Sequence, residues 1–309
     1  MFKYHLLALL LGTILDVAFG RIYSIWNPFD TIKEYVKFLD RALLGDEIIL
    51  LEPSKQKQLG LWLLFLVIAP VLVIAIFFTM LFYEISIFTG VIFEAFATYL
   101  CLEGHYLFYG GRGVMSEYYG SGFDAMKRMS EKFTASDSKA DTAEALTKET
   151  ITYIANGATD LVLNPFLIAF FFGPVGAFLY RSLHIIENQV GIFSNGCSRG
   201  NRYMYFGYYP AKLIHIIGYI PNRINGALTV FAAKYTFGDF NGKNAQYIHL
   251  RHRYKAISAY AGALGIKLKG HIGDDDNMAA PKDLRTATNL LRNTCMIYQV
   301  VLVILLLIF

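Results

Sequence analysis

The chain has 309 residues, of which 55% are hydrophobic and 17% are charged, whereas a soluble domain usually carries about 25% charged residues. Its formal net charge of +4 is small and its basic residues are dispersed, which excludes nucleic-acid binding from the expected functions. Apolar runs long enough to cross a bilayer occur from one end of the chain to the other. The sequence therefore predicts one membrane domain over residues 1–309, with the lipid bilayer as its first partner.

The first apolar run predicts a helix from about Tyr4 to Phe19. Asp16 interrupts the end of this run, and no small-residue cleavage site follows it. We therefore expect a retained membrane helix rather than a secretory signal peptide.

The polar segment 21–58 contains a predicted amphipathic helix, because its apolar residues repeat with a period near 3.6. Thr31 and Glu34 have the spacing of a capping box, which predicts the start of this helix. The repeating apolar residues are Ile32, Tyr35, Val36, Leu39 and Leu43.

Residues 59–109 are long enough for two membrane spans, with a tight turn between Glu84 and Gly90. The polar segment 110–158 then predicts a helix near 123–133 and a second helix near 142–156. Gly110-Gly111-Arg112-Gly113 lacks the spacing of a phosphate-binding loop, so we interpret it as a loop that ends a helix.

The apolar run 161–180 predicts a span that is broken at Gly173-Pro174, because proline removes a helical hydrogen bond. Residues 207–233 are less apolar and fit either a further crossing or a re-entrant pair broken at Pro221. The last span is expected from Met296 to Phe309.

Lysine and arginine concentrate in three polar segments: 21–58, 104–158 and 234–292. The positive-inside rule predicts that all three are cytoplasmic, and the predicted cytoplasmic segments are 21–58, 110–158 and 234–292. About six crossings satisfy this rule with an outside N-terminus. The predicted fold is all-α, a polytopic bundle with additional amphipathic and cytoplasmic helices.

Ionisable residues at the edges of apolar helices are costly in a membrane and usually pair or line a polar cavity. We therefore predict an intramembrane polar cluster, with residence of the same side chains in the headgroup layer as the alternative. The candidate residues are Asp16, Asp160, Arg181, His184, Glu187, His215 and Arg223.

Two groups contain residue types that bind metals: His249-Leu-Arg-His252, and His271 with Asp274, Asp275 and Asp276. Their spacing is not that of HExxH, and the Asp274-Asp275-Asp276 run lies between Gly273 and Asn277, as in a turn. We interpret these groups as solvated loop residues and predict no metal site.

Three blocks of the chain combine glycine, proline and basic residues in a fixed order. They are Gly173-Pro174-Val-Gly-Ala-Phe-Leu-Tyr180-Arg181, Tyr219-Ile-Pro221-Asn-Arg223-Ile and Ala261-Gly-Ala-Leu-Gly265-Ile-Lys-Leu-Lys-Gly270. Together with the opening Leu15-Asp16, the Asn27-Pro28 pair and the basic helix 283–292, this order resembles the CobD/CbiB family of membrane proteins in cobalamin biosynthesis.

The resemblance implies one of two functions. Enzymes of this family join an aminopropanol unit to cobyric acid as an amide at the expense of ATP, which implies acidic residues around Mg²⁺. The related AmpE branch, linked to the signalling of β-lactamase induction, keeps the scaffold without catalysis.

Several positions depart from the enzyme pattern. Its Glu-Asn-x-x-Asp corresponds to Asn156-Gly157-Ala-Thr-Asp160, so only the last aspartate is kept. Its Asn-Thr-Leu-Asp-Ser corresponds to the segment from His184 to Asn188, and its paired aspartates to Ile214-His215. Its Asn-x-Gly-Trp-Pro-Glu corresponds to the segment from His252 to Ile257. Each 1.4 kcal/mol of lost transition-state stabilisation costs about a factor of ten in rate, so these losses favour a non-catalytic protein.

The sequence thus predicts an AmpE-like, non-enzymatic protein of the bacterial inner membrane that relays envelope state to a cytoplasmic or membrane partner. It has no predicted catalytic residue, cofactor or metal. The first alternative is adenosylcobinamide-phosphate synthase, an amide-forming ligase with Mg²⁺ and ATP. The second is a carrier of a small amphiphile through a cavity around Pro174 and Pro221. The oligomeric state is not predicted.

Overall fold

The computed structural model describes residues 2–22, 26–45, 52–191, 203–241, 255–268, 272–273 and 277–308. In these ranges every regular element is helical, as the all-α prediction requires. The chain divides into two compact units. Unit 1 comprises Met1–Thr13, Ile22–Cys101 and Pro165–Tyr219, and unit 2 comprises Ile14–Arg21, Leu102–Asn164 and Ile220–Phe309. The single domain over residues 1–309 stays a prediction.

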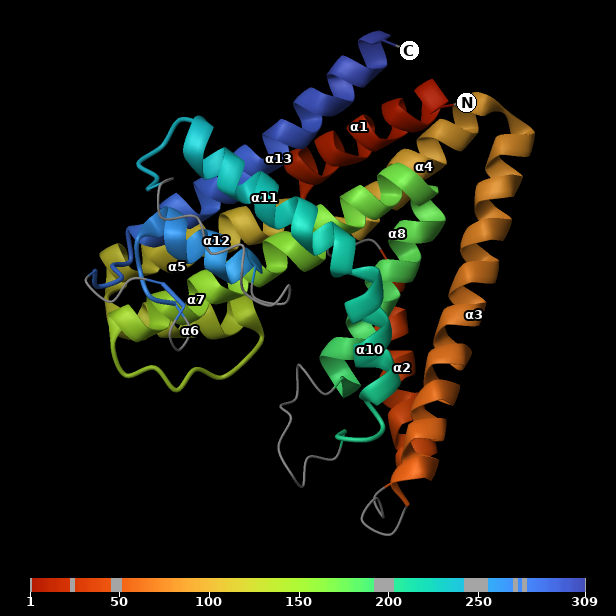
Figure 1. Cartoon of the computed structure of the whole chain (residues 1–309), viewed down its shortest axis with the longest axis horizontal. Helices are drawn as coiled ribbons and strands as arrows, with labels where there is room; N and C mark the ends of the chain where they lie inside the picture. The colour runs from red at the N-terminus through yellow and green to blue at the C-terminus, as the bar shows by residue number, and fades with distance from the viewer. Residues whose placement is uncertain are drawn as a thin grey trace. The chain divides into compact units, whose positions relative to one another are not determined.

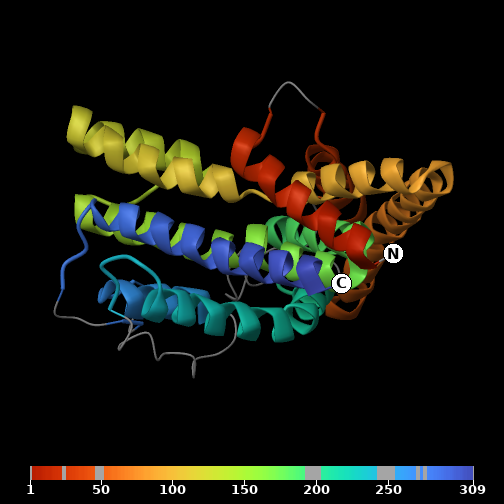
Figure 2. The same cartoon turned by 90° about the horizontal axis from the view of Figure 1, so that it is seen from above.

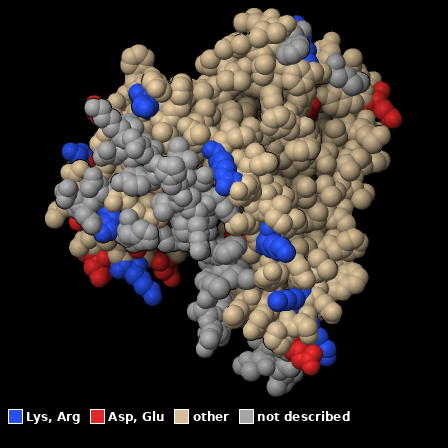
Figure 3. All heavy atoms as spheres, in the orientation of Figure 1, with Lys and Arg blue, Asp and Glu red and all other residues tan. Residues whose placement is uncertain are grey.

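Five helical stretches of the described residues are long and apolar enough to cross a membrane, which confirms a polytopic helical membrane protein. Figure 3 shows one of them, α3 (Pro53–Ile85), covered by uncharged atoms along its length, with charged atoms near its two ends. The five stretches are Phe2–Phe19, Pro53–Ile85, Ile87–Ser121, Ala143–Val190 and Asp283–Ile308.

Unit 1 is built around the hairpin of α3 and α4, whose turn at Ser86 lies where the sequence predicted it. α2 and α10 pack against α3 (Figure 1). The core between these helices and α8 is apolar and includes Val36, Leu63, Leu183 and Phe206. Helices with residues in unit 1 are α1 (Phe2–Phe19), α2 (Pro28–Leu44), α3 (Pro53–Ile85), α4 (Ile87–Cys101), α8 (Asn164–Val190) and α10 (Tyr208–Ile217).

α2 is the predicted amphipathic helix, but its start was predicted wrongly. Asn27 is the N-cap, and its side-chain oxygen accepts the Phe29 N–H at 2.9 Å, while Pro28 occupies the first helical turn. Thr31 therefore lies inside the helix, where its Oγ1 accepts from Trp26 Nε1. The Thr31/Glu34 capping box does not form because the Asn-Pro pair starts the helix earlier.

α8 contains the predicted break. Gly173 has φ 66° and ψ −166°, a left-handed backbone that favours glycine, and Pro174 follows it. Helical residues continue on both sides, from Asn164 to Val190. The proline-containing span is therefore two helical segments joined at a fixed kink.

Unit 2 contains a hairpin of α5 and α6, and α13 packs against α5 and α7. α11 crosses α13 in Figure 1 and lies next to it in the turned view of Figure 2. Unit 2 also includes the end of α1 and Asn164, the first residue of α8. Its other helices are α5 (Gly104–Ser121), α6 (Phe123–Thr134), α7 (Ala143–Gly157), the π-helical η2 (Ala158–Leu163), α11 (Tyr219–Tyr235), α12 (Lys255–Leu264) and α13 (Asp283–Ile308).

The Gly110–Gly113 stretch was predicted as a helix-ending loop, and this is wrong, because it lies inside α5. A Cβ built on Gly111 would lie 2.6 Å from Ile154 Cδ1 and 2.8 Å from Thr288 Cγ2. The glycine therefore lets α5 approach α7 and α13 closely. Close packing, rather than a turn, explains the glycine at this position.

The segment 207–233, predicted as either a fifth crossing or a re-entrant pair, consists of two shorter helices, α10 and α11. Neither is among the five stretches that are long and apolar enough to span a membrane. α10 ends at Gly218, and Pro221 lies in the first turn of α11. A backbone N–H in the first turn has no acceptor within the helix, so a proline there removes no helical hydrogen bond. The break therefore precedes Pro221.

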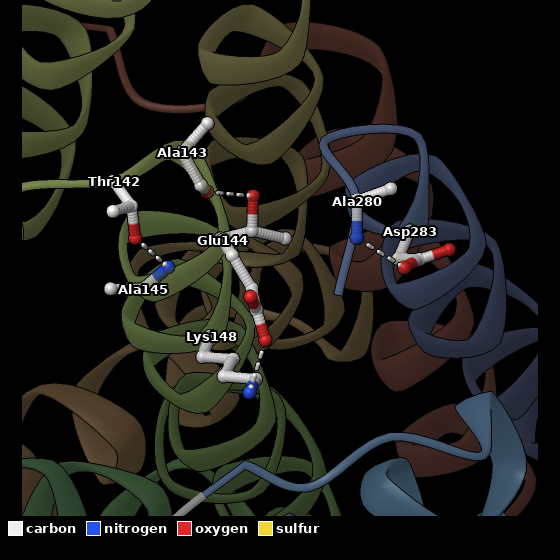
Figure 4. Close-up of polar contacts among 8 residues, drawn as sticks. Thr142, Ala143, Glu144, Ala145, Lys148, Ala280 and Asp283 are labelled. Carbon is white, nitrogen blue, oxygen red and sulfur yellow. Dashed lines mark hydrogen bonds and ion pairs between the residues drawn. The ribbon is translucent and has the colours of Figure 1, made fainter. Parts of the chain in front are cut away.

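α13 is one continuous helix of 26 residues, so the short basic helix and the last span expected from the sequence are a single element. At its start, Asp283 Oδ2 accepts the backbone N–H of Ala280 at 2.8 Å (Figure 4). Asp283, an acidic residue in the first turn, also interacts favourably with the helix dipole.

The start of α7 is capped by a side chain. Thr142 Oγ1 accepts the Ala145 N–H at 3.2 Å, and Glu144 pairs with Lys148 at 2.6 Å one turn along the helix (Figure 4). The cap satisfies a backbone donor that has no partner within the helix. The predicted helix 142–156 is thus confirmed to within one residue.

Thr142→Ala is expected to lower the free energy of unfolding by about 1 kcal/mol, the usual cost of losing such a cap. Chemical unfolding in detergent, followed by helical circular dichroism, measures this change. Thr152→Ala is the control, because Thr152 lies inside α7 and only donates to the Lys148 carbonyl oxygen. An equal loss in both variants would contradict a capping role for Thr142.

Candidate functional site

The π-helical turn η2 in unit 2 carries Asp160, one of the predicted site residues. The N–H of Asn164 reaches back five residues to the Thr159 carbonyl oxygen, the hydrogen bond that defines a π turn. The Leu161 carbonyl oxygen accepts from the Glu103 N–H at 3.2 Å. Since π turns inside helices are frequent at functional sites, η2 is the candidate functional site of unit 2.

Asp160 belongs to a polar network within unit 2 that joins residues of four helical elements. Asn164 Nδ2 donates to Asp160 Oδ1 at 3.4 Å and to Asn222 Oδ1 at 2.7 Å. Asn225 Nδ2 donates to Asn164 Oδ1 at 2.7 Å, and the Tyr298 hydroxyl donates to Asn225 Oδ1. The network therefore links η2 and the start of α8 to α11 and α13.

The two asparagines at the centre of the network form hydrogen bonds through both ends of their amide groups, whereas Asn222 uses only its oxygen. Asn164 and Asn225 are fully buried, and both use their amide oxygen and their amide nitrogen. Asn222 is half-buried; its oxygen accepts from Asn164, while its NH₂ group donates no hydrogen bond within the described residues. That NH₂ group can donate to a carboxylate or amide oxygen of a ligand.

Asp16, also in unit 2, is buried and accepts the Gly104 N–H at 3.0 Å, at the first residue of α5. A carboxylate at a helix N-terminus interacts favourably with the helix dipole. A Cβ on Gly104 would lie only 2.7 Å from Asp16 Oδ2. The contact gives Asp16 a structural role at the start of α5.

Three predicted site residues share a buried face of α8 in unit 1: Arg181, His184 and Glu187. The Arg181 guanidinium lies 5.4 Å from the centre of the Phe29 ring, a cation–π contact between α8 and α2. Asn188 Nδ2 lies 3.4 Å from His184, one turn along the helix. The structure thus brings these three ionisable residues together on one helix.

The remaining predicted residues are exposed: His215 on α10 and Arg223 on α11. Asp16, Asp160 and Arg223 belong to unit 2, whereas His215 belongs to unit 1 with the α8 face. The seven-residue cluster as a whole therefore stays a prediction.

The sequence pointed to Asp160 but missed its partners Asn164, Asn222, Asn225 and Tyr298. Two signals were available: Asn164 precedes a proline, and the other two asparagines lie three residues apart beside Pro221. Three residues is close to one helical turn, which places the two amides on the same side of α11.

Among the described residues, no three histidine, cysteine, aspartate or glutamate side chains gather where they could hold a metal ion. In the polar network, Asp160 is the single carboxylate, and the oxygens of Asn164, Asn222 and Asn225 already accept hydrogen bonds. The described residues thus do not form a side-chain cage for Mg²⁺. The candidate ligands of the two groups, His249, His252, His271 and Asp274 to Asp276, lie outside the described residues.

The sequence profile of the family described as CobD/Cbib protein matches residues 9–290. The chain belongs to the CobD/CbiB family. This confirms the family resemblance, while the AmpE-like branch within it is not confirmed.

Relatives named cobalamin biosynthesis protein CobD include one from Streptococcus sanguinis. It is 28% identical over 175 residues, which cover 50% of this chain and 53% of the relative. A second, from Leptospira interrogans, is 30% identical over 154 residues, covering 47% of this chain and 46% of the relative. A third, from Listeria monocytogenes, is 31% identical over 137 residues, covering 42% and 41%.

This CobD/CbiB chain spans about half the length of the curated relatives it matches. No solved structure matches it. The relatives' names favour the cobalamin alternative over the signalling hypothesis.

Proposed function

We propose that this protein acts in cobalamin biosynthesis, at the step that joins aminopropanol or its phosphate to cobyric acid as an amide. Family membership over residues 9–290 and the names of the relatives support this proposal. We further propose that it works in the bacterial inner membrane, since five of its helical stretches are long and apolar enough to cross a bilayer.

Within the structure, the polar network around Asp160 is the observation that supports this proposal best. It lies at the position where the family pattern keeps its aspartate, and Asn222 offers a free amide donor beside it. A substrate carboxylate or a side-chain amide of a corrinoid can accept from that donor. Asn164 holds both Asp160 and Asn222, so it orients the two groups that would meet the substrate.

Amide formation from a carboxylate needs an energy source, and ATP would supply it as an activated phosphoryl group. The described residues do not form a cage for the accompanying Mg²⁺, so we assign no residue to the metal. The proposed contribution of the network is substrate positioning through hydrogen bonds.

The test is complementation of a bacterial strain that lacks the cobinamide-forming step. The proposal expects the full chain to restore cobalamin-dependent growth without added cobinamide. Asn222→Ala is expected to slow that growth, because it removes the free donor. Gln58→Ala is the control, since Gln58 is an exposed amide of α3 that makes no side-chain hydrogen bond within the described residues. Absence of growth with well-expressed chain would overturn the proposal.

A non-catalytic, AmpE-like role is the second candidate, and one feature of the structure favours it. Gly157 stands where the family pattern has asparagine, and a Cβ there would lie 2.8 Å from Leu107 Cδ2. An apolar side chain thus fills the space that a polar group would need. Under this candidate, the chain fails to complement and its deletion alters β-lactamase induction. The carrier hypothesis stays a prediction.

A further inference from the structure

A histidine of α1 compensates the proline break in α8. In an uninterrupted helix the Phe170 carbonyl oxygen would accept the N–H of residue 174, four residues later, but Pro174 has no N–H. His5 Nε2 lies 3.0 Å from this oxygen. A carbonyl oxygen can only accept, so Nε2 carries a hydrogen and donates it. The freed carbonyl is therefore satisfied from another helix of unit 1.

The other nitrogen of the same imidazole contacts a buried carboxyl group. His5 Nδ1 is hydrogen-bonded to Glu94 Oε1, and the Tyr83 hydroxyl donates to Glu94 Oε2. Glu94 is 3% exposed and lies on α4, one of the apolar membrane-spanning stretches. An ionised acid at such a place is costly unless it is paired.

The number of protons in this contact follows from the Nε2 assignment. Because Nε2 already carries a hydrogen, the contact between Nδ1 and Oε1 needs one further proton. If the proton is on Nδ1, the pair is an imidazolium and a carboxylate; if it is on Oε1, both groups are neutral. The net charge is zero in either case. Without that proton, an Nδ1 lone pair would face a carboxylate oxygen, and the contact would be repulsive.

We propose that His5 and Glu94 form an intramembrane proton-binding site, which holds one exchangeable proton between Nδ1 and Oε1. Release of this proton leaves a neutral imidazole and a carboxylate, so the site then carries one negative charge. The ligand is a proton, bound beside the Gly173–Pro174 break: Glu94 Oε1 lies 3.8 Å from the position of a Cβ on Gly173. The site is independent of the amide-forming reaction proposed above.

Three titratable side chains make up the site, one from each of three helices: His5 of α1, Tyr83 of α3 and Glu94 of α4. α8 contributes the Phe170 carbonyl oxygen rather than a charged group. Glu84, beside Tyr83 in sequence, is exposed in the last turn of α3, near the α3–α4 turn. No other charged side chain of the described residues pairs with the three.

The test is nuclear magnetic resonance of the full chain in lipid bilayers, with ¹⁵N-labelled histidine and ¹³C-labelled glutamate carboxyls, over a series of pH values. His5→Gln and Glu94→Gln identify the two signals. Because one proton is shared, the Nδ1 signal of His5 and the carboxyl signal of Glu94 are expected to change together in a single step. The Nε2 signal is expected to stay that of a protonated nitrogen throughout.

Glu94→Gln separates proton binding from a purely structural contact. Its amide NH₂ can donate to Nδ1 and its oxygen can accept from Tyr83, so the hydrogen bonds are kept while the exchangeable proton is lost. The His5 signal in this variant is expected to lose the wild-type pH step. Glu84→Gln, at the exposed position, is expected to keep it.

Four results would overturn the proposal. One is independent titration of His5 and Glu94, and another is an unchanged pH step in Glu94→Gln. The third is the absence of any step across the pH range in which the protein stays folded, since the proton is then fixed. If sodium chloride at constant pH displaces the signals instead, the site binds a metal cation and the proton assignment is wrong.

Discussion

Gly60→Ala is expected to destabilise unit 1 by about 3 kcal/mol, the upper range for forcing an extra group into a packed interior. Gly60 lies in α3, where a Cβ would stand 2.0 Å from the Phe206 carbonyl oxygen and 3.0 Å from its carbonyl carbon. These are backbone atoms, so no side-chain rotation relieves the clash. Unfolding of the full chain in detergent, followed by circular dichroism, measures the loss.

The matched control is Gly120→Ala in α5. Gly120 is exposed, and nothing lies within 4 Å of a Cβ built there. Alanine in a helix is more favourable than glycine by about 1 kcal/mol, so this variant is expected to be neutral or slightly more stable. If Gly60→Ala is as stable as Gly120→Ala, α3 does not approach Phe206 as closely as described.

Helical periodicity predicted most of the elements correctly because it reports which face of a helix is buried. α2 and α6 were found from repeating apolar residues, and the α3–α4 turn from one polar interruption near Ser86. The Gly173–Pro174 break was also predicted, since proline always removes a helical donor.

Local motifs failed where a neighbouring residue or a distant helix decided the outcome. The Thr31/Glu34 spacing fits a capping box, yet Asn27-Pro28 starts the helix first. The glycines at 110–113 resemble a loop when only adjacent residues are considered. They are helical because α7 and α13 approach Gly111, which no local pattern contains.

The candidate sites were harder to predict because their members come from distant parts of the sequence. Asp160 was found from its charge in an apolar region, but Tyr298 joins its network from 138 residues further along the chain. His5 and Glu94 are 89 residues apart, and only packing brings α1 against α4. Asparagine gave little warning, since it carries no charge and is common in turns.

The second large effect is expected at the centre of the polar network. Asn225→Leu removes the acceptor of the Tyr298 hydroxyl and the donor to Asn164 Oδ1, both in a buried place. Each buried polar group left without a partner costs about 1–3 kcal/mol, so we expect a total loss of about 2–4 kcal/mol. Asn164→Leu is expected to cost a similar amount, because it removes the donor to Asn222 Oδ1 and the acceptor of Asn225 Nδ2. Chemical unfolding in detergent measures both.

The double variant Asn164→Leu with Asn225→Leu tests whether the two amides act as a pair. Once one amide is gone, its partner is already unsatisfied, so removing the second is expected to cost less than it does alone. We expect a coupling energy of about 1–2 kcal/mol, near the upper values measured for hydrogen bonds between membrane helices. Asn225→Leu combined with Asn293→Leu is the control, because Asn293 donates elsewhere, to Thr236 and the Phe237 carbonyl oxygen. Additive losses for Asn164 and Asn225 would mean that the network does not hold α11 to η2, and Asn222 would then lack its fixed position beside Asp160.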